Sequence, residues 1–314
     1  MNLRKFTTEK QVLDQTILIE DVVPLPKDSV GLAVLGSPIK HSISPQLHNA
    51  ALQQLSSFKP LFKKWSYKKI HVESEDLSLA LPRLAECGYL GLNLTIPHKV
   101  DVIGLIQSID AEAKTIGAVN TLMHEGGQWH GYNSDGFGLE KALFENLSFS
   151  FDSANVLILG AGGAARAAAV QALSRNCQKV WIANRSSQRL NLLKEYLVGN
   201  FESERISAFN SSDVPNELFE IENLLIINST SLGLKSNDPP PLSLSKFHST
   251  TKVYDMIYNP KQTHLLKQAA DLGMGFENGL SMLVYQAWRS LAIWTKSQIS
   301  SDAMFLAAQE ALDI

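Results

Sequence analysis

The chain has 314 residues, which is enough for about two domains of ordinary size. Hydrophobic residues make up 45% and charged residues 19%, a composition typical of globular rather than disordered chains. The formal net charge of −3 comes from interspersed charges, without the basic stripe expected of a nucleic-acid-binding or membrane-surface protein. No apolar run approaches the ~20 residues of a membrane span.

The two cysteines, Cys87 and Cys177, lie far apart, and neither belongs to a C-x-x-C pair. This spacing predicts neither a disulfide framework nor a cysteine-rich metal site, and it favours a reducing compartment. Residues 1–30 contain acidic side chains and lack a continuous apolar core, so they do not resemble a signal peptide. We therefore expect a soluble, cytoplasmic protein without a bound metal.

In the first half of the chain, short apolar runs alternate with helical patterns, which indicates an α/β protein with mainly parallel sheets. The predicted elements are strand 31–36, helix 44–55, strand 67–72, helix 77–87, strand 90–95 and the paired strands 118–124 and 128–132. Ser44 is the expected N-cap of the first helix, with Pro45 at its first helical position. Gly126-Gly127 is a hairpin signal between the last two strands.

A second strand–helix series begins at Asn155. Its predicted strands are 155–159, 179–183, 224–228 and 252–254, and the last ~35 residues from Gly279 are predicted to be helical. Two series with different motifs imply two α/β domains, joined near residues 134–138.

The second series opens with NVLILGAGGAAR, an apolar run followed by Gly160, Gly162 and Ala165 in G-x-G-x-x-A spacing. The first glycine permits a tight turn, the second lets a pyrophosphate approach the backbone, and a small third residue lets the helix pack on the strand. Backbone N–H groups and the helix dipole then face the phosphates. A strand before the motif and a helix after it favour a Rossmann-type dinucleotide site over an ordinary glycine-rich turn.

The end of the next strand indicates which dinucleotide is bound. An NAD enzyme usually carries an acid there, which accepts hydrogen bonds from the ribose 2′-hydroxyl. This chain has Asn184-Arg185-Ser186, with Arg189 four residues after Arg185. Guanidinium groups bind a 2′-phosphate through charge-assisted hydrogen bonds, so NADP is favoured over NAD. The alternative is a solvent-facing arginine at a helix start.

Four segments of the first half carry polar side chains where strands end, which is where open α/β sheets bind ligands. They are 36–49 (GSPIKHSISPQLHN), 91–99 (GLNLTIPHK), 117–121 (GAVNT) and 131–138 (GYNSDGFG). Ser42 and Ser44 lie two residues apart before a helix, so both hydroxyls can face one carboxylate. Lys99 lies in the first turn of a helix, which suits proton transfer, and Asn120 can donate and accept. The simpler interpretations are that Ser44 and Asp135 cap helices and that Lys99 is an exposed lysine.

Together these segments closely resemble the shikimate dehydrogenase family. The family patterns are G-x-P-I-x-H-S-x-S-P-x-x-H-N, G-x-N-x-T-x-P-x-K, G-A-V-N-T and N-T-D-G. The resemblance continues through GAGGAAR, Asn184-Arg185, NSTSLG (228–233), YDMIYNP (254–260) and GLSMLVYQA (279–287). It is collinear from about Gly31 to the C-terminus.

The resemblance implies specific roles for the substrate residues. Ser42 and Ser44 would bind the substrate carboxylate; Thr95, Asn120 and Gln286 would bind ring hydroxyls; Tyr258 would line the pocket; and Lys99 and Asp135 would form the catalytic pair. The implied cofactor residues are Gly160, Gly162, Gly163, Ala164, Asn184, Arg185, Ser186, Arg189, Thr230, Met256 and Gly279. His41, His48 and His98 lie inside the motifs, and we interpret them as structural hydrogen-bonding residues.

The resemblance also implies the reaction, which is NADPH-dependent reduction of 3-dehydroshikimate to shikimate in chorismate and aromatic amino-acid biosynthesis. Lys99 would protonate the developing alkoxide, and Asp135 would hold the lysine and a ring hydroxyl in place. Gln286 implies that the final helix returns to the first domain. The expected domains are an N-terminal extension 1–30, a substrate domain 31–134 plus 279–314, and a Rossmann-type NADP-binding domain 135–278. A small-molecule substrate is the expected partner, and a homodimer is left open.

Three departures from the family pattern stand out. Ser134 and Ser186 replace the family's threonines, which keeps each hydroxyl and removes a methyl group. Residues 1–30 precede the usual first strand and are interpreted as a surface-packed or frayed arm, or as an oligomer contact. The alternative functions are a quinate/shikimate dehydrogenase using NAD, a methylene-tetrahydrofolate or amino-acid dehydrogenase, and a non-catalytic dinucleotide-sensing regulator. Asn184-Arg185 opposes NAD, and the retained Lys99 and Asp135 oppose the regulator.

Overall fold

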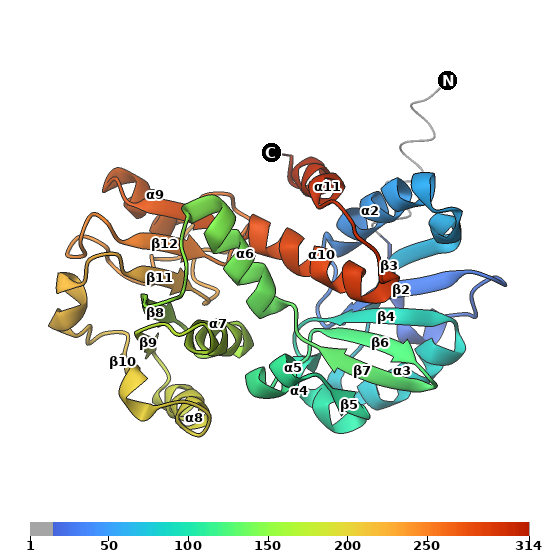
Figure 1. Cartoon of the computed structure of the whole chain (residues 1–314), viewed down its shortest axis with the longest axis horizontal. Helices are drawn as coiled ribbons and strands as arrows, with labels where there is room; N and C mark the ends of the chain where they lie inside the picture. Colours follow the sequence, from blue (N-terminus) through green and yellow to red (C-terminus); the bar gives the residue numbers. More distant parts are fainter. Residues whose placement is uncertain (1–14, 314) are drawn as a thin grey trace. The chain divides into compact units, whose positions relative to one another are not determined.

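The computed structural model describes residues 15–313, and all structural statements below concern that part of the chain. The chain forms two compact units, each built on its own sheet (Figure 1). The first unit runs to Ser134 and resumes at Gln286, and the second is Asp135–Tyr285. The point at which the chain returns to the first unit, between Tyr285 and Gln286, lies inside helix α10 (Leu280–Thr295). The sequence predicts an earlier boundary, at Gly279.

The first unit contains a seven-stranded mixed sheet in the order β1-β3-β2-β4-β6-β7-β5. Its strands are β1 (Thr16–Leu18), β2 (Val30–Gly36), β3 (Trp65–His71), β4 (Tyr89–Leu94), β5 (Ser108–Ile109), β6 (Thr121–Glu125) and β7 (Gln128–Tyr132). The strands from β1 to β4 pair in parallel, whereas β6 is antiparallel to both β4 and β7. Gly126 and Gly127 both have positive φ angles, 61° and 77°, which confirms the predicted hairpin turn.

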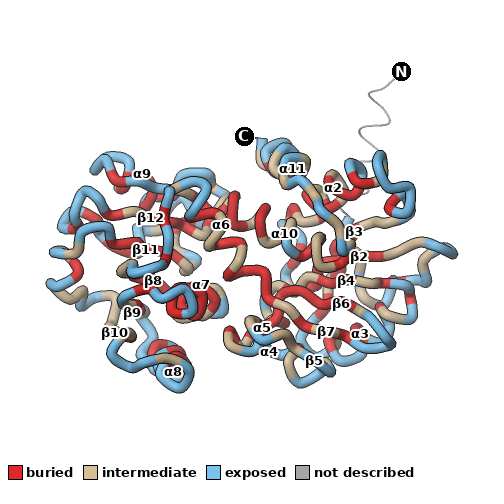
Figure 2. The backbone as a smooth tube through the Cα atoms, in the orientation of Figure 1, coloured by how far each residue is buried: buried red, intermediate tan, exposed pale blue. Residues whose placement is uncertain are grey.

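Helices cover both faces of this sheet. They are α2 (Ser44–Phe58), α3 (Leu77–Glu86), α4 (His98–Asp101), α5 (Ala111–Ile116), α11 (Asp302–Leu312) and the part of α10 (Leu280–Thr295) from Gln286 onward. On one face, Ile70 and Leu92 of the sheet pack with Leu81 and Leu84 of α3. On the other face α2 packs on β3, and α11 packs on α2. Figure 2 shows the resulting buried sheet.

The start of α2 differs from the prediction by one residue. Ser44 is the first helical residue, and Ile43 takes the N-cap position without a side-chain cap. The Ser42 hydroxyl accepts a hydrogen bond from the Ser44 backbone N–H at 3.3 Å. The expected capping role of Ser44 is therefore wrong, because the Gln46 and Leu47 N–H groups that such a cap would satisfy donate to the Ile43 carbonyl instead.

Part of the N-terminal extension belongs to the first unit. Strand β1 pairs in parallel with β3, and Val22 is buried in the core on the α3 side. Arg83 of α3 donates hydrogen bonds to the carbonyls of Glu20 and Val22 at 2.8 and 2.9 Å. Residues 15–30 therefore agree with the packed-arm interpretation, and residues 1–14 lie outside the described residues.

The second unit contains a six-stranded parallel sheet in the order β10-β9-β8-β11-β12-β13. Its elements are α6 (Asp135–Leu147), β8 (Asn155–Leu159), α7 (Gly163–Ser174), β9 (Lys179–Asn184), α8 (Ser187–Val198), β10 (Ile206–Asn210), β11 (Leu225–Asn228), β12 (Lys252–Asp255), α9 (His264–Asp271) and β13 (Gly275–Asn278). Counted within the unit, this is the order 3-2-1-4-5-6 of the Rossmann fold. The fold class is confirmed as α/β.

The cysteines and the helices show whether the described chain holds a disulfide or a membrane-spanning segment. Cys87 and Cys177 are both free and buried, so they form no disulfide with one another. Within residues 15–313, no helix combines the length and the apolar character that crossing a membrane requires.

Close packing of α10 on β4 generates a stability prediction. A Cβ atom at Gly91 would lie 2.5 Å from ring atoms of Trp294, whose indole nitrogen donates to the Leu122 carbonyl at 2.9 Å. Moving α10 away from β4 would break the Trp294–Leu122 hydrogen bond, so the added methyl group cannot be accommodated easily. Gly91→Ala should therefore lower the free energy of unfolding by ~1–3 kcal/mol, measured by urea unfolding followed by circular dichroism. Gly104→Ala is the control, because no atom lies within 4 Å of its Cβ position. Equal unfolding midpoints for the two variants would contradict this packing argument.

Candidate functional site

The polar segments of the first unit meet at one edge of its sheet. The parallel strands β2, β3 and β4 end there, and the antiparallel β6 begins there. Thr121, the first residue of β6, pairs with Asn93 on one side and with Tyr132, the last residue of β7, on the other. Side chains that follow β2, β4 and β7 and that precede β6 are therefore neighbours.

Thr95 is held just beyond the end of β4. Its backbone N–H donates to the Leu35 carbonyl at 3.0 Å, and its carbonyl accepts from the His98 N–H at 2.9 Å. A Cβ atom at Gly36 would lie 2.5 Å from the Thr95 methyl group, so glycine is required where the ends of β2 and β4 meet. The close approach of the two strand ends fixes the position of Thr95.

The Ser42 and Ser44 hydroxyls face each other at 3.2 Å. Beneath them lies Tyr67 of β3, which is buried and donates from its hydroxyl to the Asn93 Oδ1 at 2.8 Å. Burial raises the pKa of Tyr67 well above its ordinary value, and a hydrogen bond with Ser44 offsets part of that rise. The two serine hydroxyls thus lie next to each other and beside a neutral phenol.

Backbone hydrogen bonds bring the Lys99 segment beside the end of β7. The Val119 N–H donates to the Lys99 carbonyl at 2.8 Å. The next residue, Asn120, donates from its backbone N–H to the Tyr132 carbonyl at 3.1 Å and accepts at Oδ1 from the Ser134 N–H at 2.8 Å. Asp135 follows Ser134 directly in the chain and is the first residue of α6.

Asn120 also reaches the C-terminal part of the chain. It is 2% exposed, and its Nδ2 donates to the Ser134 hydroxyl at 3.0 Å and to the Gln286 Oε1 at 3.3 Å. Asn120 and Gln286 are 166 positions apart in sequence. The structure therefore brings together two residues that are far apart in the sequence.

A buried serine that the sequence analysis did not identify connects this cluster. The Ser290 hydroxyl donates to the Gln286 carbonyl at 3.0 Å and lies 2.7 Å from the Thr121 Oγ1. It accepts from the Asn93 Nδ2 at 3.0 Å and lies 3.2 Å from the Ser134 hydroxyl. Gln286 is itself a predicted site residue. The other three partners of Ser290 lie one or two positions in sequence from a predicted site residue.

The histidines inside the motifs differ in their surroundings. His48 stacks on Tyr67 with ring centroids 4.0 Å apart, and complete burial lowers its pKa to about 3. The His98 Nε2 lies 2.8 Å from the Val72 carbonyl, and burial lowers its pKa as well. Both rings are thus neutral at neutral pH. His98 makes the kind of hydrogen bond that was expected, whereas His48 is held mainly by stacking on Tyr67. His41 is exposed.

In the second unit, the glycine motif lies at the point where the strand order reverses, between β8 and β11. Gly160 has a φ of +115°, and a Cβ atom there would lie 2.6 Å from the Ser229 hydroxyl. No atom lies within 4 Å of the Cβ positions of Gly162 and Gly163, whereas Ala165 is fully buried. Gly162 is the N-cap of α7, and Ala164 lies in its first turn. This open backbone at a helix N-terminus fits a pyrophosphate.

The predicted 2′-phosphate residues follow β9. Arg185 and Arg189 are exposed at the start of α8, and Ser186 caps that helix by accepting from the Arg189 N–H at 3.4 Å. The Asn184 Nδ2 donates to the Ser186 carbonyl at 3.0 Å, which shapes the turn. No acidic residue occupies this turn, so both guanidinium groups fit a phosphate.

A buried polar network shapes the remaining cofactor loops. The Thr230 hydroxyl and N–H donate to the Asn228 Oδ1 at 2.7 and 3.0 Å, and the Asn228 Nδ2 donates to Asp255 at 2.9 Å. Burial raises the pKa of Asp255. A Cβ atom at Gly279 would clash with the Met256 carbonyl oxygen. The close contact between these two predicted cofactor residues therefore requires glycine at position 279.

The predicted site residues are divided between the two units. Ser42, Ser44, Thr95, Lys99, Asn120 and Gln286 belong to the first unit, whereas Asp135, Tyr258 and all the cofactor residues belong to the second. Tyr258 is half-buried, and burial raises its pKa. The sequence analysis missed Tyr67, Asn93 and Ser290, although Asn93 lies inside GLNLTIPHK and Ser290 lies one helical turn after Gln286.

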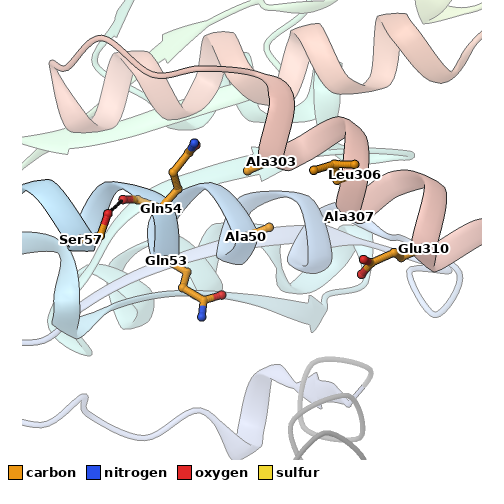
Figure 3. A pocket seen from close by; sticks show the side chains of 8 residues that line it. All are labelled: Ala50, Gln53, Gln54, Ser57, Ala303, Leu306, Ala307 and Glu310. Carbon is orange, nitrogen blue, oxygen red and sulfur yellow. Dashed lines mark hydrogen bonds between the residues drawn. The ribbon is translucent and has the colours of Figure 1, made fainter.

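A separate hollow of about 350 Å³ lies between α2 and α11 (Figure 3). Its lining residues are Ala50, Gln53, Gln54, Ser57, Ala303, Leu306, Ala307 and Glu310. Those of α2 lie on the outer face of that helix, away from Leu47 and Ala51, which are buried. The hollow contains none of the predicted site residues, so it is not part of this site.

Comparison with known proteins agrees with the geometry. Residues 34–122 match the family model of the shikimate dehydrogenase substrate binding domain, and residues 141–232 match that of shikimate / quinate 5-dehydrogenase. The chain is 40% identical over 265 residues to the shikimate dehydrogenase (NADP(+)) of Geobacter metallireducens, covering 84% of this chain and 90% of that protein.

Two solved structures share the fold over nearly their whole length. One is shikimate 5-dehydrogenase from Thermus thermophilus in complex with NADP(H) and shikimate, with a TM-score of 0.78, 31% identity, and coverage of 90% of this chain and 100% of that one. The other is ligand-free 5-ketofructose reductase of Gluconobacter, with a TM-score of 0.79, 28% identity, and coverage of 90% and 98%. With two matching family models and this level of identity, the chain belongs to the shikimate dehydrogenase family.

Proposed function

We propose that this chain is an NADP-dependent oxidoreductase that interconverts 3-dehydroshikimate and shikimate. The observation that carries the proposal is the Asn120 cluster, in which one buried amide contacts Ser134 and Gln286 and follows the residue bonded to Lys99. Polar groups gathered at the ends of parallel strands suit a small polyhydroxylated ligand. Family membership supports the same reaction.

The substrate would be held at both ends of its ring. Ser42 and Ser44 present hydroxyls to the carboxylate, supported by their mutual contact at 3.2 Å. Thr95, Asn120 and Gln286 bind ring hydroxyls, and Tyr258 lines the pocket. An amide both donates and accepts, so Asn120 and Gln286 discriminate the direction of each hydroxyl as well as its position.

Lys99 and Asp135 would supply the proton chemistry. When bound, NADPH supplies the hydride that converts the ring ketone to an alcohol. The Lys99 ammonium donates a proton to the ketone oxygen and stabilises the charge that develops there. Asp135 orients the lysine and a ring hydroxyl, so the two residues would act as a unit in proton transfer.

The cofactor residues would divide the dinucleotide between three loops. The backbone of Gly160, Gly162, Gly163 and Ala164 binds the pyrophosphate, supported by the open space over Gly162 and Gly163. Asn184, Arg185, Ser186 and Arg189 bind the adenine ribose and its 2′-phosphate. Thr230, Met256 and Gly279 would contact the remainder of the dinucleotide.

One assay tests the proposed reaction. Purified protein is mixed with shikimate or quinate and with NADP⁺ or NAD⁺, and the reduced nicotinamide is followed by its absorbance. Shikimate with NADP⁺ should give the highest kcat/KM. A faster reaction with quinate and NAD⁺ would instead indicate a quinate/shikimate dehydrogenase, and no turnover with any combination would indicate the non-catalytic regulator.

Cofactor choice should depend on Arg185. We expect a preference for NADP over NAD of at least about tenfold in kcat/KM, roughly 1.4 kcal/mol of differential binding. Arg185→Ala should reduce this preference, mainly by raising the KM for NADP⁺. Arg175→Ala is the matched control, because Arg175 is also an exposed arginine and pairs with Glu140 at 2.9 Å. Equal use of both cofactors by the unmodified enzyme would contradict the prediction.

Loss of the catalytic pair should lower turnover far more than binding. Lys99→Ala removes a general acid, so kcat should fall by about 10²–10⁴-fold. The Kd for shikimate should change much less, because the serine pair is retained. Asp135→Asn should act similarly, and the double variant should lose little beyond the worse single one. Lys63→Ala, at an exposed lysine, is the control. Losses that multiply in the double variant would show that the residues act independently.

Ser290 should support substrate binding without touching the substrate. Ser290→Ala removes the hydroxyl shared by Asn93, Thr121 and Ser134, and leaving such buried partners unpaired costs about 1–3 kcal/mol of stability. Because Asn120 and Gln286 lose this support, the KM for shikimate should rise several-fold. Ser57→Ala is the control, since its exposed hydroxyl also donates to a preceding helical carbonyl, that of Gln54. An unchanged melting temperature and KM for Ser290→Ala would refute this role.

A further inference from the structure

Lys69 is a buried lysine that the described chemistry does not use. It lies in the middle of β3 and is 2% exposed. Side chains alternate along a strand, so Lys69 shares the α2 face of the sheet with Tyr67, whereas Ile70 packs in the core on the α3 side. A buried ammonium is costly unless strong acceptors surround it, so this position calls for a specific purpose.

The side chain of Lys69 ends beneath the serine loop. Its Nζ donates to the Lys40 carbonyl at 3.0 Å and to the Ser42 carbonyl at 3.4 Å. The Ser42 N–H in turn donates to the Ile39 carbonyl at 3.0 Å, so the loop forms a tight turn around the ammonium. Four covalent bonds separate the Ser42 carbonyl oxygen from its Oγ, which places the charge within roughly 10 Å of any group that this hydroxyl binds.

We propose that Lys69 determines specificity for the carboxylate of the substrate, by placing a buried positive charge behind the Ser42 and Ser44 hydroxyls. The inference rests on the proposed function, because that function assigns these hydroxyls to the carboxylate. The ammonium acts without direct contact. It attracts an anion through the loop.

The surroundings strengthen this effect. Tyr67, the neighbouring side chain on the same face of β3, stays neutral because its pKa is raised well above the ordinary value. It therefore supplies no negative charge that would cancel the ammonium at neutral pH. In a poorly solvated site, charge attraction over several ångströms is much stronger than in water. Two neutral hydroxyls alone would prefer a carboxylate to an uncharged ester only through their charge-assisted hydrogen bonds, and a nearby ammonium would add to that preference.

The test compares an anionic with a neutral substrate. Shikimate and its methyl ester share every ring hydroxyl and differ in the charge of the carboxyl end. Initial rates with NADP⁺, measured well below saturation, give kcat/KM for each. Lys69→Gln keeps an N–H donor for the loop carbonyls and removes the charge, Lys69→Met removes both, and Lys69→Arg keeps the charge. Lys68→Met is the matched control on the other face of β3.

Removal of the charge should change the ratio of the two substrates. Lys69→Gln should lower kcat/KM for shikimate by about tenfold or more and leave that for the ester nearly unchanged. Lys69→Arg and Lys68→Met should retain the ratio of the unmodified enzyme. Circular dichroism and NADP⁺ affinity establish that each variant is folded. If Lys69→Met does not fold, Lys69→Gln against Lys69→Arg still isolates the charge.

Two negative results have different meanings. If Lys69→Gln lowers both substrates equally, or neither, Lys69 only supports the loop and the proposal is wrong. If the unmodified enzyme does not oxidise shikimate, the proposed function itself fails, and the assignment of the serine pair to a carboxylate fails with it.

Discussion

Asn120 carries the interaction on which the first unit's site depends. It is nearly fully buried, and its one amide contacts the end of β7 through Ser134 and the α10 helix through Gln286. Its side chain therefore cannot turn without leaving buried groups unpaired, which costs more than the hydrogen bonds gain. Ser290 braces the same groups from behind. A residue fixed in this way holds the ends of β6, β7 and α10 in one arrangement, which is the preorganisation that the proposed recognition of ring hydroxyls requires.

The second unit uses strand order rather than side-chain bonding for the same purpose. Because the order reverses between β8 and β11, the loops after these strands diverge and leave backbone exposed. Gly160 meets Ser229 there, and Gly279 meets the Met256 carbonyl, at distances that no larger residue tolerates. Glycine is thus required at both places for the chain to fold, in addition to any contact with a dinucleotide.

Motifs and strand patterns predicted much of this fold, because each rests on local chemistry. The hairpin at Gly126-Gly127 and the strand before Gly160 are examples. The short edge strands β1, β5, β10 and β13 were not predicted, since two to five residues carry little periodicity and pairing with a neighbour defines them. Ser290 and Lys69 were missed for a related reason. From sequence alone, a serine in a helix or a lysine in a strand is expected to be exposed to solvent. Only the tertiary structure shows that Ser290 and Lys69 are buried.

The distribution of charge shows why overall composition says little about ligands. The chain has a formal net charge of −3, yet the groups proposed to attract its anionic ligands are the buried Lys69 and the exposed pair Arg185 and Arg189. Exposed charges are screened beyond about 8–10 Å at physiological salt, so the acidic surface elsewhere has little influence on either position. The arginine pair and the buried lysine would attract an anion in different ways. Exposed guanidinium groups offer bidentate hydrogen bonds to a phosphate that remains partly in water, and their strength falls with added salt. In the proposed site, the buried Lys69 ammonium would act through the serine loop on a carboxylate that leaves water, so added salt would weaken this attraction little. The carbonyls of Lys40 and Ser42 accept hydrogen bonds from the ammonium whether or not a ligand is bound, which offsets the cost of its burial.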